Sequence, residues 1–375
     1  MTLALDGLTV IALEQAVAAP YCSHRLREAG ADVIKIERPE GDFARGYDTA
    51  VAGQSAYFVW ANSGKRSVVL DLKREVDVDK LRAMLREADV FVQNLKPGVL
   101  PRLGIDLDAA RRENPRLITC CIAGYSSAGP SATKKAYDLL IQAETGLASI
   151  TGGPEAPGRV GVSICDIACG MYAYDNILLA LLARGSNGGQ GRHLEITLFD
   201  ALAQWMAVPY LLERYGGGAP ERVGIAHPGI SPYGVFVSAD GRPFVLAVQS
   251  EREWQWLCDG FLERPDWKSD ARTTPNEARL AHRTLVDGAV AERAATLDYA
   301  EIARQLELAN IAFAPVNEVA ALKAHADFRT RRVAVGAAVV EVPVTPGAPG
   351  DGAPASVPGL GEHTEAVLAE FGLTD

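Results

Sequence analysis

The sequence has no long apolar run and no basic, apolar start of the kind that marks membrane and secreted proteins. No stretch of about 18 uninterrupted apolar residues occurs, and the most apolar segment, Ile167–Ala183, is interrupted by Asp175 and Asn176. The opening residues Met1–Leu8 contain neither a basic cluster nor a long apolar core. The sequence therefore predicts a cytoplasmic protein without a membrane span or a secretory signal.

Cysteine is scarce, and the common nucleotide-binding motifs are missing. Six cysteines are scattered over 375 residues, and Cys165 and Cys169, four positions apart, have no histidine nearby. This arrangement is weak as a metal site and thin as a disulfide framework, so buried free thiols are favoured. Neither G-x-G-x-x-G nor a Walker A sequence is present, and Glu14–Pro20 follows the first strand-like run instead. Bound NAD or ATP is therefore disfavoured, and no metal or tightly bound cofactor is expected.

Positive charge is also in short supply. Lys and Arg number 37 against 47 Asp and Glu, which gives a formal net charge of −10, while 48% of the residues are hydrophobic. The composition is that of a soluble globular protein, and the acidic balance argues against nonspecific nucleic-acid binding. Any anionic ligand must therefore be met by a local group of basic residues.

Strand-like and helix-like segments alternate through the first third of the chain. Short apolar runs typical of buried strands are Leu8–Leu13, Asp32–Glu37, Ser67–Leu72, Val90–Asn94 and Leu117–Ile122. Helical patterns between them cover Pro20–Ala29, Asp79–Ala88 and Leu107–Asn114. The alternation predicts an α/β fold whose mostly parallel, Rossmann-like sheet is covered by helices on both faces.

The pattern changes further along the chain, which is long enough for a second lobe. A hairpin with Asp240-Gly241 at its turn follows a glycine-rich patch at 216–218. Helices are expected around Asp200–Tyr215, Glu251–Phe261, Asn276–Glu292, Tyr299–Leu308 and Thr364–Phe371, and Pro346–Pro358 predicts an extended path. We expect a large α/β domain over 1–221, a small α+β domain over 222–330, and a C-terminal segment, 331–375, that returns to the large domain.

Basic residues gather where the predicted strands end. Ligands of open α/β sheets bind beyond the carboxyl ends of the strands. Those ends carry Val17–Pro20, Glu37–Pro39, Lys73-Arg74, Asn94–Gly98 and Ala123–Tyr125. The cations at or near them are Arg38, Lys73, Lys96, Arg102, Lys134 and Lys135. Such a group in an acidic protein suits a polyphosphate ligand, although for any single cation a solvated surface charge is favoured.

One carboxylate, Asp166, lies between two segments of different character. Val160–Cys165 is rich in β-branched residues and predicts a short strand, whereas Ile167–Ala183 is rich in Ala, Leu and Ile and predicts a mostly buried helix. An aspartate at this junction can accept hydrogen bonds from the first helical N–H groups, and the helix dipole then favours its ionised form. Asp166 is either an ordinary helix cap or a nucleophile fixed in position by the helix, and this stretch alone favours the helix cap.

The landmarks taken together resemble the class III coenzyme A transferases, which include formyl-CoA transferase and the carnitine CoA-transferases. Matching blocks in order are Leu5–Val10, Gly30–Pro39 with Gly41-Asp42, Asn62–Val68, Leu70–Lys73, Asn94–Gly98, Tyr137-Asp138 with Gln142-Ala143 and Gly146, and Leu360–Thr364. Each block is weak by itself, but the ordered set spans nearly the whole chain and is specific. The resemblance implies a CoA-transferase that uses acyl-CoA and a carboxylic acid, and an interlocked homodimer, which the extended segment and returning C-terminal helix would fit.

The resemblance also implies a mechanism and a set of site residues. The family's nucleophile corresponds to Asp166, which attacks an acyl-CoA thioester to form an aspartyl–acyl anhydride; CoA thiolate then returns to give an aspartyl–CoA thioester, and the acceptor carboxylate takes the CoA. This moves the interpretation of Asp166 from cap to nucleophile, or both. The implied CoA contacts are Val17, Ala18, Arg38, Lys73, Asn94, Leu95, Arg102, Lys135 and Tyr137, with Arg38, Arg102 and Lys135 at phosphates.

Two departures from the family's pattern bear on the substrate. Ala18-Ala-Pro20 stands where many relatives have Ala-Gly-Pro, and His227–Gly234 replaces the glycine run of formyl-CoA transferase. This block, with Val248–Trp254 and Arg159–Asp166, looks more like the branch acting on C4–C5 dicarboxylates such as mesaconate, itaconate, citramalate or succinate. A second carboxylate needs a cation, for which His227 or Arg159 is a candidate, although His227 is equally well explained as a loop-packing residue.

Three alternatives stand beside this interpretation. A formyl-CoA/oxalate or carnitine-type transferase would share the chemistry. A 2-methylacyl-CoA racemase of the same fold needs a histidine before the residue equivalent to Asp138, where this chain has Tyr137. Tyrosine, with a reference pKa near 10, is a poor base at neutral pH, so the transferase is favoured. A non-catalytic acyl-CoA-binding protein would not need an intact Asp166.

Overall fold

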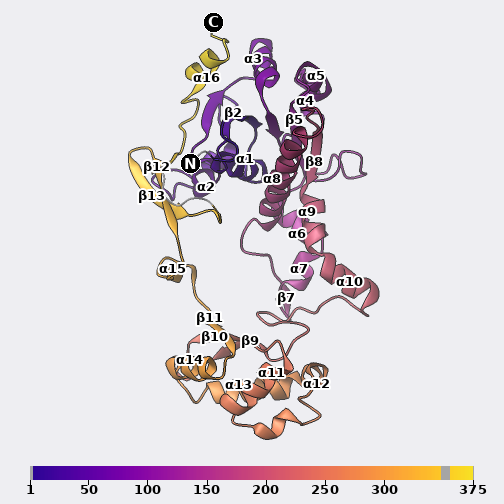
Figure 1. The fold of residues 1–375 in the computed structure, drawn as a ribbon, viewed down its shortest axis with the longest axis vertical. Coiled ribbons are helices and arrows are strands. Elements are labelled where there is room, and N and C mark those ends of the chain that lie inside the picture. Colours follow the sequence, from indigo (N-terminus) through magenta and orange to yellow (C-terminus); the bar gives the residue numbers. More distant parts are fainter. Residues whose placement is uncertain (1–2, 348–354, 375) are drawn as a thin grey trace. The chain divides into compact units, whose positions relative to one another are not determined.

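The computed structural model describes residues 3–347 and 355–374, and the chain forms two compact units. The first comprises the described residues up to Leu147, Val160–Val208 and the C-terminal part from Arg329; the second comprises Ala148–Arg159 and Pro209–Phe328. The chain therefore leaves the first unit after Val208 rather than at 221. The second unit also includes a short segment, 148–159, that the sequence pattern places in the large domain. Figure 1 draws both units and labels most of their helices and several of their strands.

A six-stranded parallel sheet forms the centre of the first unit, with strand order β3-β2-β1-β4-β5-β8. The strands are β1 (Thr9–Leu13), β2 (Asp32–Glu37), β3 (Arg66–Val69), β4 (Val90–Gln93), β5 (Ile118–Ala123) and β8 (His193–Thr197). This is the Rossmann-type order, so the predicted α/β fold is confirmed. Strand order reverses between β1 and β4, and ligands of such sheets bind at that switch point.

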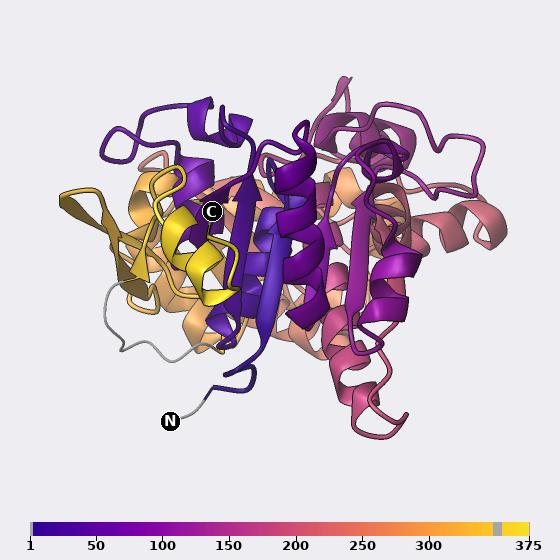
Figure 2. The ribbon, with the colours of Figure 1, turned by 90° about the horizontal axis from the view of Figure 1, so that it is seen from above.

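Side chains along β1 point alternately to the two faces of the sheet, and each set belongs to a separate hydrophobic core. Val10 and Ala12 pack with α1 (Ala18–Glu28), α8 (Ile164–Arg184) and α9 (Leu198–Trp205). Ile11 and Leu13 pack on the other face with α3 (Glu75–Glu87), α5 (Leu107–Glu113) and α16 (Thr364–Glu370). Figure 2 shows α16, in yellow, in front of the strands. Because both faces are covered, the strands are rich in apolar residues, and five of the six could be predicted; β8, which contains His193 and Glu195, was missed.

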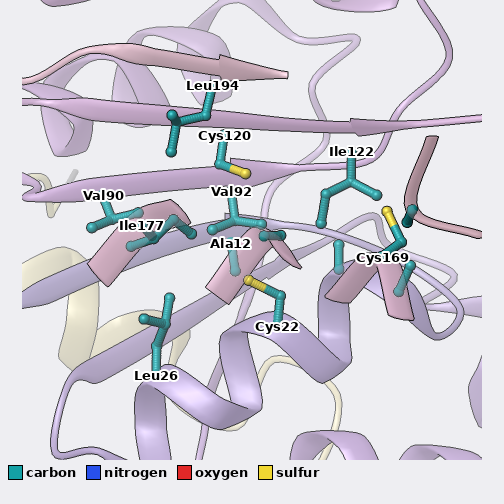
Figure 3. Close-up of a cluster of buried hydrophobic side chains, with 14 of the residues drawn as sticks. Ala12, Cys22, Leu26, Val90, Val92, Cys120, Ile122, Cys169, Ile177 and Leu194 are labelled. Carbon is teal, nitrogen blue, oxygen red and sulfur yellow. The ribbon is translucent and has the colours of Figure 1, made fainter. Parts of the chain in front are cut away.

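The six cysteines are free thiols, as predicted, and five of them are buried. Figure 3 shows Cys22 of α1, Cys120 of β5 and Cys169 of α8 among the aliphatic side chains of the first core. Burial raises the pKa of the Cys22 and Cys169 thiols well above the usual range. These cysteines act as small apolar core residues.

The helix α8 lies against α1 so closely that one position has no room for a side chain. A Cβ on Gly170 would lie 2.7 Å from the Ala18 carbonyl oxygen and 2.9 Å from the Tyr21 ring. By length and composition α8 would pass as a membrane-crossing helix, a test that core helices also pass. Its buried residues belong to the core shared with α1 and the sheet.

The predicted strand over Val160–Cys165 is wrong. Residues 160–163 form an irregular segment with a bend, and α8 begins at Ile164. Its local β propensity is overridden because the Cys165 N–H donates to Asp138 and the Ile167 N–H donates to the Ser163 carbonyl, which closes the first helical turn.

The remaining elements of the first unit attach the C-terminal part of the chain. The strands β12 (Thr330–Val335), β13 (Ala338–Pro343) and β14 (Ala355–Ser356) form a small sheet that packs on α2 (Ala56–Asn62). The predicted C-terminal helix is present as α16, and the predicted extended stretch Pro346–Pro358 lies partly outside the described residues. Other elements are η1 (Phe43–Gly46), α4 (Val99–Arg102) and α6 (Asp138–Glu144); α7 (Leu147–Ile150) begins at the last residue of the first unit's N-terminal segment and continues into the second unit.

The second unit has its own core around a three-stranded antiparallel sheet. Its strands are β9 (Tyr233–Val237), β10 (Pro243–Ala247) and β11 (Ala312–Pro315), and its other elements are β6 (Gly152–Gly153), β7 (Ala156–Pro157), the C-terminal part of α10 (Ala207–Tyr215), α11 (Glu251–Gly260), η2 (Pro265–Lys268), α12 (Asn276–Ala281), α13 (Arg283–Ala294), α14 (Tyr299–Leu308) and α15 (Val319–Leu322). The hairpin turn at Asp240-Gly241 is confirmed, whereas the single helix expected over Asn276–Glu292 is divided at His282.

Gly170→Ala should lower the free energy of unfolding by about 1–3 kcal/mol, because the added methyl group would force α1 and α8 apart. Gly288→Ala is the matched control: that glycine also lies inside a helix, and its added Cβ would meet open space. Since alanine favours helices by up to about 1 kcal/mol over glycine, the control should be neutral or stabilising in urea denaturation. Equal effects of the two changes would contradict the close contact.

Candidate active site

The loops after β1 and β4 are joined at the switch point of the sheet. The Asn94 side chain accepts a hydrogen bond from the Gln15 N–H at 3.0 Å and donates one to the Gln15 carbonyl at 2.8 Å. The next residue, Ala16, has a φ of 65°, and the chain then enters α1 through Val17 and Ala18, both buried. The predicted contacts Val17, Ala18 and Asn94 therefore lie together where a ligand of this sheet type binds.

Asp166 lies in the first turn of α8, two residues after Ile164, and it does not cap the helix. The N-cap residue is Ser163, so the prediction of Asp166 as a cap is wrong. Its half-buried carboxylate makes no hydrogen bond to any part of the chain that the structure describes. Burial raises the pKa of Asp166 to about 7, and the nearby charge of Asp138 adds to the shift. The expectation that the helix dipole keeps this group ionised is therefore wrong, since desolvation outweighs it.

A second carboxylate, Asp138, has the opposite environment. One of its oxygens accepts a hydrogen bond from the Cys165 N–H at 2.7 Å, and the other accepts from the Gln142 side chain at 2.7 Å. Gln142 in turn accepts from the Val160 N–H at 2.9 Å. This network holds the segment that leads into α8 and thereby sets the position of Asp166. In the sequence, Asp138 and Gln142 are recognised only as residues that match the family, and this structural role is not predicted for them.

Aromatic side chains near Asp166 are the part of the site that sequence reasoning missed. Tyr47 packs edge-on against Tyr57, with ring centroids 5.7 Å apart, and against Phe43. The Tyr57 hydroxyl lies 3.4 Å from the hydroxyl of Ser163, the N-cap of α8. Burial, followed by the charges of Asp42 and Asp166, raises the pKa of Tyr47 to about 12. A concentration of aromatics over 43–60 in a chain with only 7% aromatic residues is the signal that could have indicated them.

The predicted basic contacts lie in the first unit, at the surface. All four of the following are exposed: Arg38, Lys73, Arg102 and Lys135. Arg38 donates a hydrogen bond to the Gly41 carbonyl, and Arg102 donates one to the Gly98 carbonyl. Leu95 is half-buried beyond β4, and Tyr137, 65% exposed, precedes Asp138. The geometry brings Val17, Ala18, Asn94, Leu95, Tyr137 and Asp166 to one edge of the sheet. Of the further cations, Lys134 pairs with Glu144.

The two predicted substrate residues, Arg159 and His227, belong to the second unit. Both are exposed. The His227 ring stacks on Tyr233 with centroids 5.4 Å apart, and its Nδ1 accepts a hydrogen bond from the Gly229 N–H at 3.0 Å. Arg283 donates to the His227 carbonyl. These contacts fit the loop-packing alternative for His227, and its contact with substrate stays a prediction. Among the described residues no group of three or more His, Cys, Asp or Glu is placed to hold a metal ion.

Comparison with known proteins covers almost the entire chain. The model of CoA-transferase family III matches residues 5–364. The chain belongs to this family. The resemblance in sequence is thereby confirmed, and this family III protein is a CoA-transferase whose substrates include CoA thioesters.

Relatives of this CoA-transferase resemble it over most of their length. The succinate–glutarate CoA-transferase of Agrobacterium fabrum is 33% identical over 98% of this chain and 95% of its own. The succinyl-CoA:mesaconate CoA-transferase of Haloarcula hispanica is 32% identical over 84% of this chain and 81% of its own. The crystal structure of a CAIB/BAIF family protein from Brucella suis has a TM-score of 0.84, with 32% identity over 99% of this chain and 100% of the other.

With Asp166 as the predicted nucleophile, the rate of CoA transfer should rise with pH through about 7, because a carboxylate attacks only when ionised and burial raises the pKa of Asp166 to about 7. Asp138→Asn removes the neighbouring negative charge, so the ascending limb of kcat/KM should move to lower pH. Asp175→Asn should leave the limb in place, since that exposed aspartate lies nine residues, roughly 13 Å, further along α8. A limb unchanged by Asp138→Asn would contradict the electrostatic coupling of the two carboxylates.

Proposed function

We propose that this CoA-transferase moves CoA from an acyl-CoA thioester to a carboxylic acid through covalent intermediates on Asp166. The observation that carries the proposal is the contrast between two neighbouring carboxylates. Both oxygens of Asp138 are engaged by hydrogen bonds, whereas Asp166 is half-buried and makes none within the described chain. A carboxylate without such partners is the one that can attack.

The proposed reaction has two covalent stages. Asp166 attacks the thioester carbonyl, the C–S bond breaks, and CoA leaves as a thiolate, which gives an aspartyl–acyl anhydride. The thiolate then attacks the Asp166 carbonyl and releases the donor acid, which leaves an aspartyl–CoA thioester. The acceptor carboxylate repeats these steps in reverse order and departs as the new thioester, which restores Asp166.

The described site supplies what this chemistry needs. A carboxylate is a weak nucleophile, so catalysis depends on positioning and on keeping water from the anhydride. The Asp138–Gln142 network positions the start of α8, and the Tyr57 hydroxyl lies beside Ser163 with the Tyr47 ring packed edge-on against the Tyr57 ring. A carboxylate whose pKa is raised to about 7 is also more basic, and hence a stronger nucleophile once ionised, than one with an ordinary pKa.

For the acceptor we propose a C4–C5 dicarboxylate such as succinate, mesaconate, itaconate or citramalate. The names of two relatives, a succinate–glutarate and a succinyl-CoA:mesaconate CoA-transferase, support this class. The second carboxylate of such an acid requires a cation, for which Arg159 and His227 are the candidates. A relative from Streptomyces avermitilis named formyl-CoA:oxalate CoA-transferase, 31% identical over 100% of this chain, keeps oxalate as the alternative acceptor.

We further propose that the enzyme works as a homodimer. Large apolar side chains are exposed on consecutive helices of the first unit: Leu179 and Leu182 of α8, Trp205 of α9 and Val208 of α10. Exposed apolar groups of this size are typical of surfaces that associate.

Asp166→Ala should reduce CoA transfer by at least about a thousandfold, since the covalent route is lost. Asp175→Ala, a change at an exposed aspartate of the same helix, should retain activity. A loss of activity through misfolding can be distinguished from the loss of the nucleophile. Folding raises the pKa of Asp166, so at a pH above the ordinary pKa of an aspartate its ionised form destabilises the folded protein. At pH 8 an Asp166→Asn variant should be at least as stable to heat as the wild type. Full activity of Asp166→Ala would disprove the nucleophile.

Trapping of the intermediate gives a direct chemical readout. Incubation with succinyl-CoA and hydroxylamine should inactivate the enzyme by converting Asp166 into a hydroxamate, which mass spectrometry locates. A label found on another carboxylate, such as Asp138, would overturn the assignment, and Asp166→Asn should take up none.

Arg159→Met and His227→Ala should raise KM for a dicarboxylate acceptor more than for the CoA donor, because each removes a candidate partner of the second carboxylate. The measurement is steady-state transfer from succinyl-CoA to mesaconate, glutarate, oxalate and the monocarboxylate butyrate. A preference for butyrate, or an effect on the donor alone, would contradict the proposed acceptor class.

A further inference from the structure

The loop that precedes α1 contains a backbone conformation that its residue disfavours. Ala16 has a φ of 65°, in the left-handed region where a Cβ crowds the carbonyl oxygen. Such residues persist only where surrounding contacts hold them, and they concentrate at functional loops. Ala16 lies immediately before Val17 and Ala18, whose backbone is expected to meet acyl-CoA.

The contact that holds Ala16 comes from a buried carboxylate 26 residues later in the sequence. An oxygen of Asp42 accepts hydrogen bonds from the Ala16 N–H at 3.1 Å and from the Ala44 N–H at 2.9 Å. Asp42 is 5% exposed. It therefore connects the loop after β1 to the short helix η1, which leads to Tyr47.

Asp42 is itself held by a lysine inside the sheet. The Lys35 ammonium, fully buried on β2, lies 2.9 Å from the second oxygen of Asp42 and 3.5 Å from Glu14. It also donates to the Glu14 carbonyl at 3.3 Å. On its other side, Glu14 pairs with buried Lys65 at 2.6 Å. Two cations and two carboxylates thus balance in the interior at the carboxyl edge of β1 and β2.

A buried ion network is a poor source of stability, since desolvating the charges offsets their attraction. Its value here is geometric. Removal of the Asp42 acceptor would leave the Ala16 N–H unsatisfied and Lys35 short of a partner, and Ala16 could then relax to a negative φ. Relaxation would turn Val17 and the first peptide groups of α1 away from their present direction.

We propose that Asp42, held by Lys35, is a positioning residue that keeps Ala16 in the left-handed conformation and so directs the Val17–Ala18 backbone at the acyl-CoA substrate. This inference rests on the proposed function, because it concerns the CoA-binding loop of that reaction. Asp42 does not touch the reacting atoms. It acts through the loop, and loss of its hydrogen bond should affect CoA binding before it affects the chemical step.

The test is a rescue experiment with the full-length enzyme. Asp42→Ala should weaken binding of coenzyme A, measured by titration calorimetry, and raise KM for succinyl-CoA, each by about tenfold, the scale of one left-handed alanine. The change in kcat should be smaller. Adding Ala16→Gly to this variant should bring both the Kd for coenzyme A and the KM for succinyl-CoA back to within about threefold of the wild-type values, because glycine adopts positive φ without the steric cost.

Ala52→Gly in the Asp42→Ala background is the matched control. Ala52 also has a positive φ, 50°, in an exposed turn, so it offers the same relief of strain at a place outside the loop. It should leave the weakened CoA binding uncorrected. If Asp42→Ala does not fold, Asp42→Leu serves instead, since its apolar side chain fills the space of the carboxylate and likewise offers no acceptor to the Ala16 N–H.

The outcomes separate the two proposals. A wild type that transfers no CoA between carboxylic acids would overturn the proposed function. A wild type that transfers CoA, combined with an Asp42 variant of unchanged KM, or with a variant that Ala16→Gly fails to rescue, would overturn the positioning role alone. Rescue by Ala52→Gly to the same extent would show a general effect on stability and would also overturn it.

Discussion

The close contact between α1 and α8 at Gly170 is the constraint on which the site depends. Because no Cβ separates the two helices there, the first turn of α8 lies beside the start of α1. Asp166 is one turn before that glycine, and the loop through Ala16 leads directly into Ala18. A single position without a side chain therefore brings Asp166, the proposed nucleophile, close to the loop that we propose binds CoA, although Ala16 and Asp166 are 150 residues apart in the sequence.

Two aspartates of similar sequence context acquire different tasks from their surroundings. Asp138 has its charge spread over donors from Cys165 and Gln142, and so it serves as a structural anchor. Asp166 has burial without donors, which raises its pKa to about 7 and keeps its oxygens open to an electrophile. The charge of Asp138 adds to the rise in the pKa of Asp166, the proposed nucleophile, so one residue contributes both to its positioning and to its electrostatic environment.

Five of the six strands could be predicted because they are rich in buried apolar residues, and the bounds of Asp32–Glu37 agree to the residue, whereas the more polar β8 was missed. The sequence-based predictions are wrong where contacts with residues distant in the sequence determine the local structure. Val160–Cys165 has β-branched residues but is drawn into the start of a helix by Asp138, and nothing in the local pattern announces that bond. Lys35 within a strand also looks like a surface residue until its partners Asp42 and Glu14 are seen. Asp166 itself required the family resemblance, because the helix start alone favoured a cap.

The environment of Cys165 bears on which atom of the protein accepts the acyl group. A thiolate is a far stronger nucleophile than a carboxylate, and this cysteine directly precedes Asp166. Burial raises the pKa of the Cys165 thiol, and its sulfur donates to the Asp138 carbonyl at 3.3 Å, so it remains protonated and turned inward. Protonated Cys165 therefore leaves the carboxylate of Asp166, the proposed nucleophile, without a competing thiolate at the preceding position.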